Sequence, residues 1–240
     1  MKHLKNIIRD NLGLIYYNAY KRFLKKGNRC LIYHAFGSKI EHDTYGISIN
    51  INKFKDHIKY LTDNFPIANY NDFNNEISIS LSIDDGYEDT NKAIDILIEY
   101  KFPFSLFITS GNINKKGYLC KNDIINISKI ENSNIGTHGA HHVKLGTVDN
   151  ITQYEELKAS KDMLEDILGQ EVLSLSYPHG SYNLDTLDIV KQLGYKWAAC
   201  SQKGFNRKDT NRYLLNRSEI ISSDTPKDLL KKIEGYYDYY

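Results

Sequence analysis

Short apolar runs alternate along the chain with longer segments in which apolar residues recur every three or four positions. The short runs end at polar residues, and some are rich in β-branched or aromatic residues, as is typical of buried strands. The runs that qualify as strands cover residues 30–34, 66–70, 77–83, 104–109, 134–137, 173–177, 196–200 and 214–220. The pattern therefore predicts seven or eight strands.

The segments between these runs have the 3.6-residue period of helices that bury one face. The clearest apolar faces are formed by Ala93, Ile94, Leu97 and Ile98 and by Leu157, Leu164, Ile167 and Leu168. Asp149 and Asn150 are typical of helix starts, and Gly169 and Gly194 of helix ends. Alternation of strands and helices predicts an α/β fold with a parallel sheet.

Several chemically useful residues stand where an apolar run stops. Asp84, Asp85 and His138 lie at two such ends, and His34 and Tyr177 lie at two others. In a barrel of parallel strands the chemistry takes place at the C-terminal strand ends. These side chains are therefore predicted to meet in one site.

Composition sets the outer limits of this interpretation. The chain has 240 residues with 41% hydrophobic content, enough for one domain with a sizeable core. Its formal net charge of +1 gives no global field for nucleic acid, and we expect no nucleic-acid partner. The three cysteines, Cys30, Cys120 and Cys200, are far apart and form no CxxC pair, so neither a disulfide framework nor a thiolate zinc site is indicated.

The ends of the chain differ from its middle. Residues 1–29 form a basic segment with amphipathic patterning, residues 30–235 the predicted α/β domain, and residues 236–240 a Tyr-rich tail. No stretch reaches transmembrane length, and Arg9 and Asp10 interrupt the only apolar core of a signal peptide, so we expect a cytoplasmic location. The N-terminal segment fits either a helix on the inner face of a membrane or a helix packed on the barrel.

Two motifs carry the candidate chemistry. Ser82-Ile83-Asp84-Asp85-Gly86-Tyr87 holds adjacent carboxylates, and Gly136-Thr137-His138-Gly139-Ala140-His141-His142 holds a His-x-x-x-His set. One carboxylate and two imidazoles can bind a zinc-like ion and leave a position open. The second carboxylate can then take a proton from water. Together the two motifs favour hydrolysis.

At this point the residues resemble a known family, the polysaccharide deacetylases of carbohydrate esterase family 4. Ser82-Ile83-Asp84-Asp85-Gly86 is similar to the family's Thr-Phe-Asp-Asp-Gly, and Gly136 to Leu145 to its second, His-containing motif. Tyr177-Pro178-His179-Gly180 resembles the Tyr-Pro-Tyr-Gly of one branch. Tyr33-His34 and Leu215-Asn216-Arg217-Ser218-Glu219-Ile220 resemble further segments of that branch, in the same order along residues 30–233.

The resemblance implies a single-domain, distorted (β/α) barrel of about seven parallel strands. It also implies a carbohydrate deacetylase that removes an acetyl group from an acetylated glycan with the help of a divalent metal, most often Zn²⁺, with Co²⁺ or Ni²⁺ as alternatives. It makes Asp85, His138 and His142 the metal ligands, Asp84 the general base and His34 the general acid.

The chain departs from the family pattern in the third motif. Ser176 stands where most members have an arginine that orients the base, and we expect Arg217 to supply that guanidinium. His179 replaces an aromatic residue, and its backbone N–H can still hold the oxyanion. His141 is the neighbour of His142, and a shift of one residue would make it the ligand instead.

Two other functions stay open. The acyl group can be formyl, or the sugar can be carried by a lipid or a nucleotide, which fits a lone domain acting in cell-envelope glycan biosynthesis. A catalytically silent glycan-binding domain is a second alternative, against which the intact Asp84, Asp85, His138 and His142 argue. The sugar, the linkage, the native metal and the oligomeric state are not determined by these patterns.

Overall fold

Seven parallel strands form one curled sheet. The computed structural model describes residues 8, 10–19, 27–41, 43–70 and 77–239. Within them the sheet order is β6-β5-β4-β3-β2-β1-β7. The strands are β1 (Asn28–Tyr33), β2 (Ser78–Ile83), β3 (Phe104–Ile108), β4 (Ser133–Thr137), β5 (Ser174–Ser176), β6 (Trp197–Ala199) and β7 (Ser218–Glu219). All pairs are parallel, which confirms the predicted α/β fold with about seven parallel strands.

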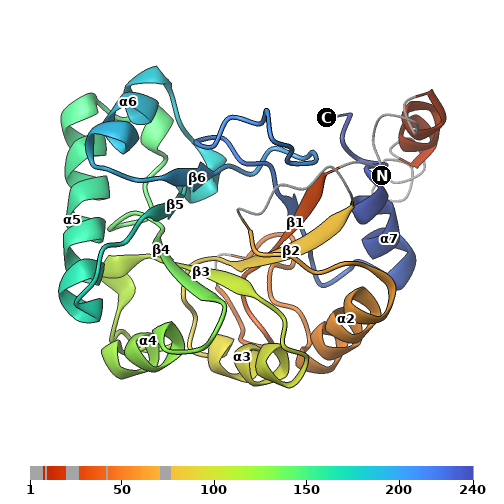
Figure 1. Ribbon diagram of the computed structural model, residues 1–240, viewed down its shortest axis with the longest axis horizontal. Coiled ribbons are helices and arrows are strands. Elements are labelled where there is room, and N and C mark those ends of the chain that lie inside the picture. Colours follow the sequence, from red (N-terminus) through yellow and green to blue (C-terminus); the bar gives the residue numbers. More distant parts are fainter. Residues whose placement is uncertain (1–7, 9, 20–26, 42, 71–76, 240) are drawn as a thin grey trace.

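Helices surround the curled sheet from α6 and α5 at one side, past α4 and α3, to α2 and α7 at the other (Figure 1). Their bounds are α2 (Ile51–Asn64), α3 (Thr90–Glu99), α4 (Lys121–Ser128), α5 (Asn150–Leu168), α6 (Leu184–Gln192) and α7 (Pro226–Glu234). Three 3₁₀ turns, η1 (Ser110–Asn112), η2 (Leu145–Thr147) and η3 (Pro178–Gly180), follow strands β3, β4 and β5 in the chain. These turns belong to loops beyond the C-terminal strand ends.

One segment draws the two edges of the sheet together. Leu215 forms a parallel bridge with Ala199 of β6, and β7 three residues later pairs with β1. The predicted strand over residues 214–220 is therefore shorter than expected and is shared between two partners. This arrangement gives the barrel its distortion and brings Arg217 between β6 and β1.

The predicted strand over residues 66–70 is wrong. It makes a single bridge, between Ile67 and Ile79, because its ladder stops after two hydrogen bonds. The chain then turns, and the Tyr70 ring packs against Trp197 at 4.7 Å and Phe107 at 6.4 Å. Tyr70 is thus used to fill a small apolar cluster rather than to extend the sheet.

The helix signals fall where the structure begins and ends its helices. Asp149 caps α5 by accepting a hydrogen bond from the Thr152 amide, and Gly169 ends the helix with a left-handed φ of 66°. In α3 the expected face was partly wrong, because Ile98 is 49% exposed. Ile96 is buried there instead, so the buried face is rotated by part of a turn.

The two ends of the described chain pack together. The Tyr17 ring stacks on Tyr236 at 4.3 Å, and Asp10 forms an ion pair with Lys231 at 2.8 Å. The tail is also tied to the barrel, because the fully buried Arg29 holds the Asp238 carboxylate through two hydrogen bonds of 2.9 and 2.7 Å. Much of the basic N-terminal segment, residues 1–7, 9 and 20–26, lies outside the described residues.

Among the described residues, no helix combines the length and apolar character that crossing a membrane requires.

Candidate active site

A cleft of about 580 Å³ lies at the C-terminal ends of the strands. Its walls bring together the ends of β1, β2 and β4 with the turn after β5 and with β7. The lining residues are His34, Tyr45, Ile47, Asp84, Asp85, His138, His142, Lys144, Tyr177, His179, Ser181, Ser201, Lys203 and Glu219. All of the predicted metal ligands are among them, as are Asp84, His34 and His179.

Asp85, His138 and His142 converge on one point. Their ligand atoms all lie within 4.8 Å of one another. The Asp85 Oδ1 atom is 3.5 Å from His138 Nε2 and 3.4 Å from His142 Nε2, and the two Nε2 atoms are 3.2 Å apart. A carboxylate with two imidazoles is a donor set that suits a divalent transition metal.

The hydrogen bonding of His138 supports this fit. Its Nδ1 atom lies 2.8 Å from the Ser176 carbonyl oxygen, which can only accept a hydrogen bond. The Nδ1 atom therefore carries the proton, and burial lowers the pKa of His138 to about 4, which keeps the ring neutral. Its Nε2 lone pair then faces the Asp85 carboxylate. An imidazole lone pair that faces a carboxylate is a donor arrangement that a cation can bridge, so these residues fit a metal.

Left-handed backbone marks the site. Asp85, His142 and His179 have φ values of 75°, 58° and 56°, which lie in a backbone region that residues other than glycine rarely adopt. The Asp85 turn is closed by the Gly86 amide, which donates to the Asp84 carbonyl at 3.0 Å. Strained residues of this kind persist where the surroundings fix them and often gather at functional sites. Here the strain turns Asp85 away from its neighbour Asp84.

Asp84 occupies a different environment from Asp85. The Arg217 guanidinium donates from Nη1 to Oδ1 at 2.7 Å and from Nη2 to Oδ2 at 2.8 Å, and the Ser176 hydroxyl donates to Oδ2 at 2.9 Å. Burial alone would raise the pKa of Asp84, but Arg217 and then His138 hold it well below its usual range. The guanidinium of Arg217, which the sequence analysis expected to orient this carboxylate, therefore contacts both of its oxygens.

Arg217 is itself held from several sides. It is fully buried, its Nε donates to the Cys200 carbonyl at 2.9 Å, and its Nη1 also donates to the Ser82 hydroxyl at 3.0 Å. Its Nη2 donates to the Ser176 hydroxyl at 2.6 Å. The small side chain at position 176 therefore leaves room for a guanidinium that arrives from the segment before β7.

His34 lies across the cleft near Glu219. Its Nε2 is 3.9 Å from Glu219 Oε1, and its buried Nδ1 has no hydrogen-bond partner within the described part of the chain. The imidazole is 14% exposed. It is therefore positioned to face a molecule in the cleft while keeping a carboxylate beside it.

His179 and His141 have different surroundings. The His179 ring packs on the His142 ring at 4.3 Å, and burial lowers its pKa. The His141 side chain is 72% exposed and its Nδ1 lies 2.6 Å from the Glu156 carboxylate. The geometry thus brings His142, and not His141, to the cluster.

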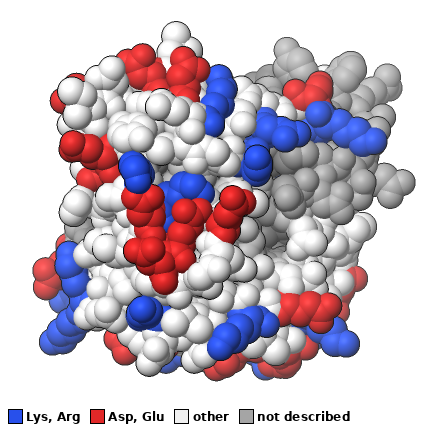
Figure 2. Space-filling view, turned by 60° about the vertical axis from the view of Figure 1, so that its left-hand side comes forward, with Lys and Arg blue, Asp and Glu red and all other residues white. Residues whose placement is uncertain are grey.

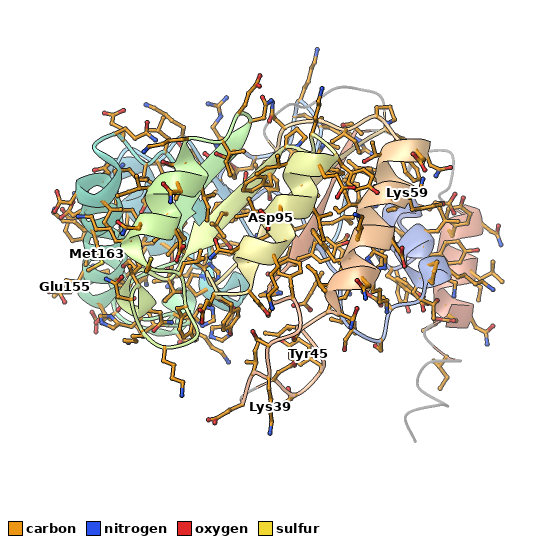
Figure 3. All side chains as sticks on the ribbon, turned by 90° about the horizontal axis from the view of Figure 1, so that it is seen from below. Lys39, Tyr45, Lys59, Asp95, Glu155 and Met163 are labelled. Carbon is orange, nitrogen blue, oxygen red and sulfur yellow. The ribbon has the colours of Figure 1, made fainter. Side chains whose placement is uncertain are left out.

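A loop forms one rim of the cleft. Tyr45 lines the cleft, is 62% exposed, and lies with Lys39 on a loop that projects from the body of the molecule (Figure 3). Three backbone amides, those of Tyr45, Gly46 and Ile47, donate to the Asp43 carboxylate and fix this turn.

Figure 2 shows acidic and basic side chains side by side on the α5 side of the molecule, so charge of a single sign does not cover that face.

The sequence analysis missed several residues that shape the site. A hydrogen bond joins Tyr87 to Asp85, and burial followed by the charge of Asp85 raises the pKa of the Tyr87 hydroxyl. Tyr118 stacks on Tyr87 at 5.1 Å. Glu156 and Glu219 were also missed. The signal for Tyr87 was its place directly after the Asp-Asp-Gly turn, and that for Glu219 was its place in the segment over residues 215–220. Tyr118 and Glu156 lie outside the motifs that they support.

Comparison with known proteins identifies the family and the fold. A family model described as polysaccharide deacetylase matches residues 72–198. The YxkH protein of Bacillus subtilis is 25% identical over 203 residues, which are 79% of this chain and 70% of that protein. The poly-beta-1,6-N-acetyl-D-glucosamine N-deacetylase of Staphylococcus aureus is 24% identical over 175 residues, 67% of this chain and 60% of that enzyme.

Solved structures share the fold. A polysaccharide deacetylase from Bacillus cereus has a TM-score of 0.76 at 22% identity, covering 87% of this chain and 69% of that one. The Streptococcus pyogenes deacetylase PplD, in complex with acetate, has a TM-score of 0.75 at 22% identity, covering 86% and 98%. Because the family model matches more than half of the 240 residues, this chain belongs to the polysaccharide deacetylase family, the hydrolases of carbohydrate esterase family 4.

Proposed function

We propose that this chain is a metal-dependent hydrolase that removes the acetyl group from an N-acetylated sugar of a polysaccharide, an oligosaccharide or a lipid-linked glycan. One observation carries the proposal: a metal-type cluster of Asp85, His138 and His142 adjoins a separately held carboxylate, Asp84, in a single cleft. The Staphylococcus aureus relative acts on an N-acetylated glucosamine polymer, and the PplD structure holds acetate, the product of deacetylation.

The cluster of Asp85, His138 and His142 would hold the metal, with zinc as our first choice. A divalent metal bound there supplies Lewis-acid chemistry, because it lowers the pKa of water and polarises an acyl oxygen. Asp84 accepts the proton of the attacking water. Its pairing with Arg217 keeps it ionised and oriented but makes it a weak base. It can therefore accept a proton efficiently only from a water molecule whose pKa has been lowered.

The other cleft residues act on the sugar amide. The His179 backbone N–H, presented by the left-handed turn after Tyr177, donates to the acyl oxygen as negative charge develops there. His34 gives a proton to the leaving amine, and its Nε2 atom lies 3.9 Å from the Glu219 carboxylate at the wall of the cleft. Acetate and a free amino sugar leave the cleft.

Metal removal tests the proposal. The protein is treated with a chelator, dialysed, and assayed on N-acetylated oligosaccharides by mass spectrometry of both products. We expect turnover to disappear and to return with zinc or cobalt, and Asp85→Ala to bind neither ion tightly. Full turnover of the metal-free protein would contradict the metal mechanism. Release of formate from N-formylated sugars in preference to acetate would redirect the acyl assignment.

A further inference from the structure

We propose that Glu156, in the second turn of α5, is the positioning residue for His142, and that it sets the affinity of this chain for its metal. The inference rests on the proposed metal-dependent function and names a residue outside the motifs that indicate it. Glu156 does not line the catalytic cleft. It contacts the short loop between the two histidine ligands.

Glu156 accepts three hydrogen bonds from this loop. Its Oε2 accepts from the Ala140 amide at 3.1 Å and from the His141 amide at 2.8 Å. Its Oε1 lies 2.6 Å from His141 Nδ1. Ala140 and Glu156 are 4% and 8% exposed, so water has little access to replace the carboxylate. Two successive backbone N–H groups therefore depend on one side-chain oxygen.

The carbonyl groups of the same loop are held from the other direction. The Ser110 amide donates to the Gly139 carbonyl at 3.1 Å, and the Gly111 amide donates to the Ala140 carbonyl at 2.9 Å. A Cβ atom at Gly111 would lie 2.5 Å from that carbonyl oxygen, so the approach requires glycine. The loop is thus fixed between η1, which satisfies its carbonyls, and α5, which satisfies its amides.

His142 comes directly after this fixed loop and has the left-handed φ of 58°. Such a conformation relaxes unless its surroundings hold it. His138 has an independent support, since the Ser176 carbonyl orients its ring. Loss of the Glu156 contacts should therefore displace the Nε2 atom of His142 while leaving His138 in place. Displacement of this ligand lowers the affinity for the metal, although all three donor residues are still present.

The exposed His141 provides a matched control. It gives up one hydrogen bond to Glu156 when truncated, but the two backbone contacts to the carboxylate do not involve its side chain. If Glu156 holds the loop through these two backbone hydrogen bonds, His141→Ala should leave the metal affinity unchanged. If instead the His141 side chain itself supported the metal site, His141→Ala would lower the metal affinity, because His141 is adjacent to the ligand His142.

The test is a zinc titration of metal-free protein in competition with a chromophoric chelator. Wild type, Glu156→Ala, Glu156→Gln, Glu156→Asp and His141→Ala are compared, with thermal unfolding of each metal-free protein. We expect Glu156→Ala and Glu156→Asp to bind zinc roughly 10–100-fold more weakly, the range for residues that orient metal ligands. Aspartate keeps the charge but is too short to reach the loop. Glutamine keeps the reach, and its amide oxygen should preserve affinity within a few-fold.

Three outcomes would overturn the inference. Equal zinc affinity of folded Glu156→Ala and wild type would show that the loop does not need Glu156 to hold His142 in place. A loss in Glu156→Gln with full affinity in Glu156→Asp would mean that charge, and not position, is what matters. A loss in His141→Ala as large as in Glu156→Ala would assign the effect to His141. Should Glu156→Ala not fold, the Gln and Asp variants decide. A wild type without zinc affinity would instead refute the proposed function, and this inference with it.

Discussion

The adjacent residues Asp84 and Asp85 have different neighbours: an arginine and a serine surround the first, and two imidazoles face the second. Asp84 lies between Arg217 and Ser176 and is 2% exposed, whereas Asp85 turns through a left-handed residue toward the two imidazoles. An extended strand sends neighbouring side chains to opposite faces, and the turn after β2 adds to that separation. The pair can therefore divide two tasks, proton transfer and metal binding, between residues that are neighbours in sequence.

The substitution Asp84→Asn separates these tasks. Asparagine has nearly the same shape but cannot accept the proton, so we expect turnover to fall by roughly 10²–10⁴-fold while zinc affinity changes little. Because Arg217 loses its counter-charge, thermal stability should fall as well. Turnover, zinc affinity and the unfolding temperature are measured on the same preparation. A loss of zinc equal to that in Asp85→Ala would mean that the two aspartates exchange roles.

The substitution Arg217→Ala leaves a buried carboxylate without its partner. Removing one member of a buried ion pair costs about 3–5 kcal/mol of stability, and a misoriented base should lower the turnover number as well. Arg29→Ala is the matched control, because Arg29 is also fully buried and pairs with Asp238 away from the catalytic cleft. We expect similar stability losses but a turnover defect, at temperatures where both are folded, only in Arg217→Ala. Equal turnover in the two variants would refute the orienting role.

At the scale of elements, the strand ends could be predicted because apolar runs and polar stops are properties of contiguous residues. Strands β1 to β6 fall inside their predicted runs or within two residues of them. The segment over 66–70 has the same apolar character, but Tyr70 packs against Trp197 and Phe107, which are distant in the sequence, and no local pattern reveals that contact. Which of Ile96 and Ile98 is buried likewise depends on the elements that pack against α3, and these are distant in the sequence.

The site could be predicted only as far as its motifs extend. The meeting of Asp85 with the two imidazoles and the pairing of Arg217 with Asp84 each bring together residues that the sequence motifs contain. Glu156 gave no such signal, because an acidic residue on an exposed-looking helix is ordinary until the loop beside it is known. Residues that act through another residue are therefore the part of a site that sequence patterns reveal least.

Helix α2 carries a buried histidine with a consequence for stability. His57 is 3% exposed and its Nδ1 lies 3.2 Å from the Tyr33 hydroxyl of β1. Burial lowers the pKa of His57 to about 4, whereas an unfolded histidine titrates near 6.5. The unfolded chain thus binds more protons between these values, so stability is fully present above pH 6.5 and is lost as the pH falls toward 4.

Urea unfolding of wild type and His57→Gln at pH 7 and pH 5 measures this contribution. Each pKa unit corresponds to about 1.4 kcal/mol, so wild type should lose up to roughly 2 kcal/mol more than the variant over this range. Both proteins are used metal-free, which makes the titration of other histidines common to both and removes it from the difference. Equal losses in the two proteins would show that His57 is charged in the folded state or titrates normally.

At the scale of the whole molecule, the two chain ends form a small structure of their own beside α7. The helical residues 10–19 use one side, with Asp10, Gly13 and Tyr17, to pack on the C-terminal residues. Another side of this helix remains apolar and exposed: Leu12 is 48% exposed and Ile15 is 67% exposed. The sequence analysis offered a helix packed on the barrel or a helix on a membrane as alternatives. This helix packs on the C-terminal residues with one side and leaves apolar side chains exposed on another, so the prediction about the membrane is untested.

The basic sequence around this stripe leads to a prediction about membranes. Seven Lys and Arg residues stand within the first 26 positions, and each basic residue near an anionic surface contributes about 1 kcal/mol of attraction. Apolar side chains that enter the interface add to this. We therefore expect the full-length protein to co-sediment with vesicles rich in anionic lipid, less so at high salt, and hardly at all with zwitterionic vesicles.

The double substitution Leu12→Glu and Ile15→Glu should abolish most of that sedimentation without changing turnover on soluble oligosaccharides, because neither side chain lines the catalytic cleft. Ile151→Glu is the matched control, since Ile151 is equally exposed at 68% but lies on α5. Sedimentation of the control should equal that of wild type. If the double variant also sediments like wild type, the exposed stripe has no membrane role, and the helix serves to cover the C-terminal residues. If the control loses sedimentation to the same extent, added negative charge alone explains the effect.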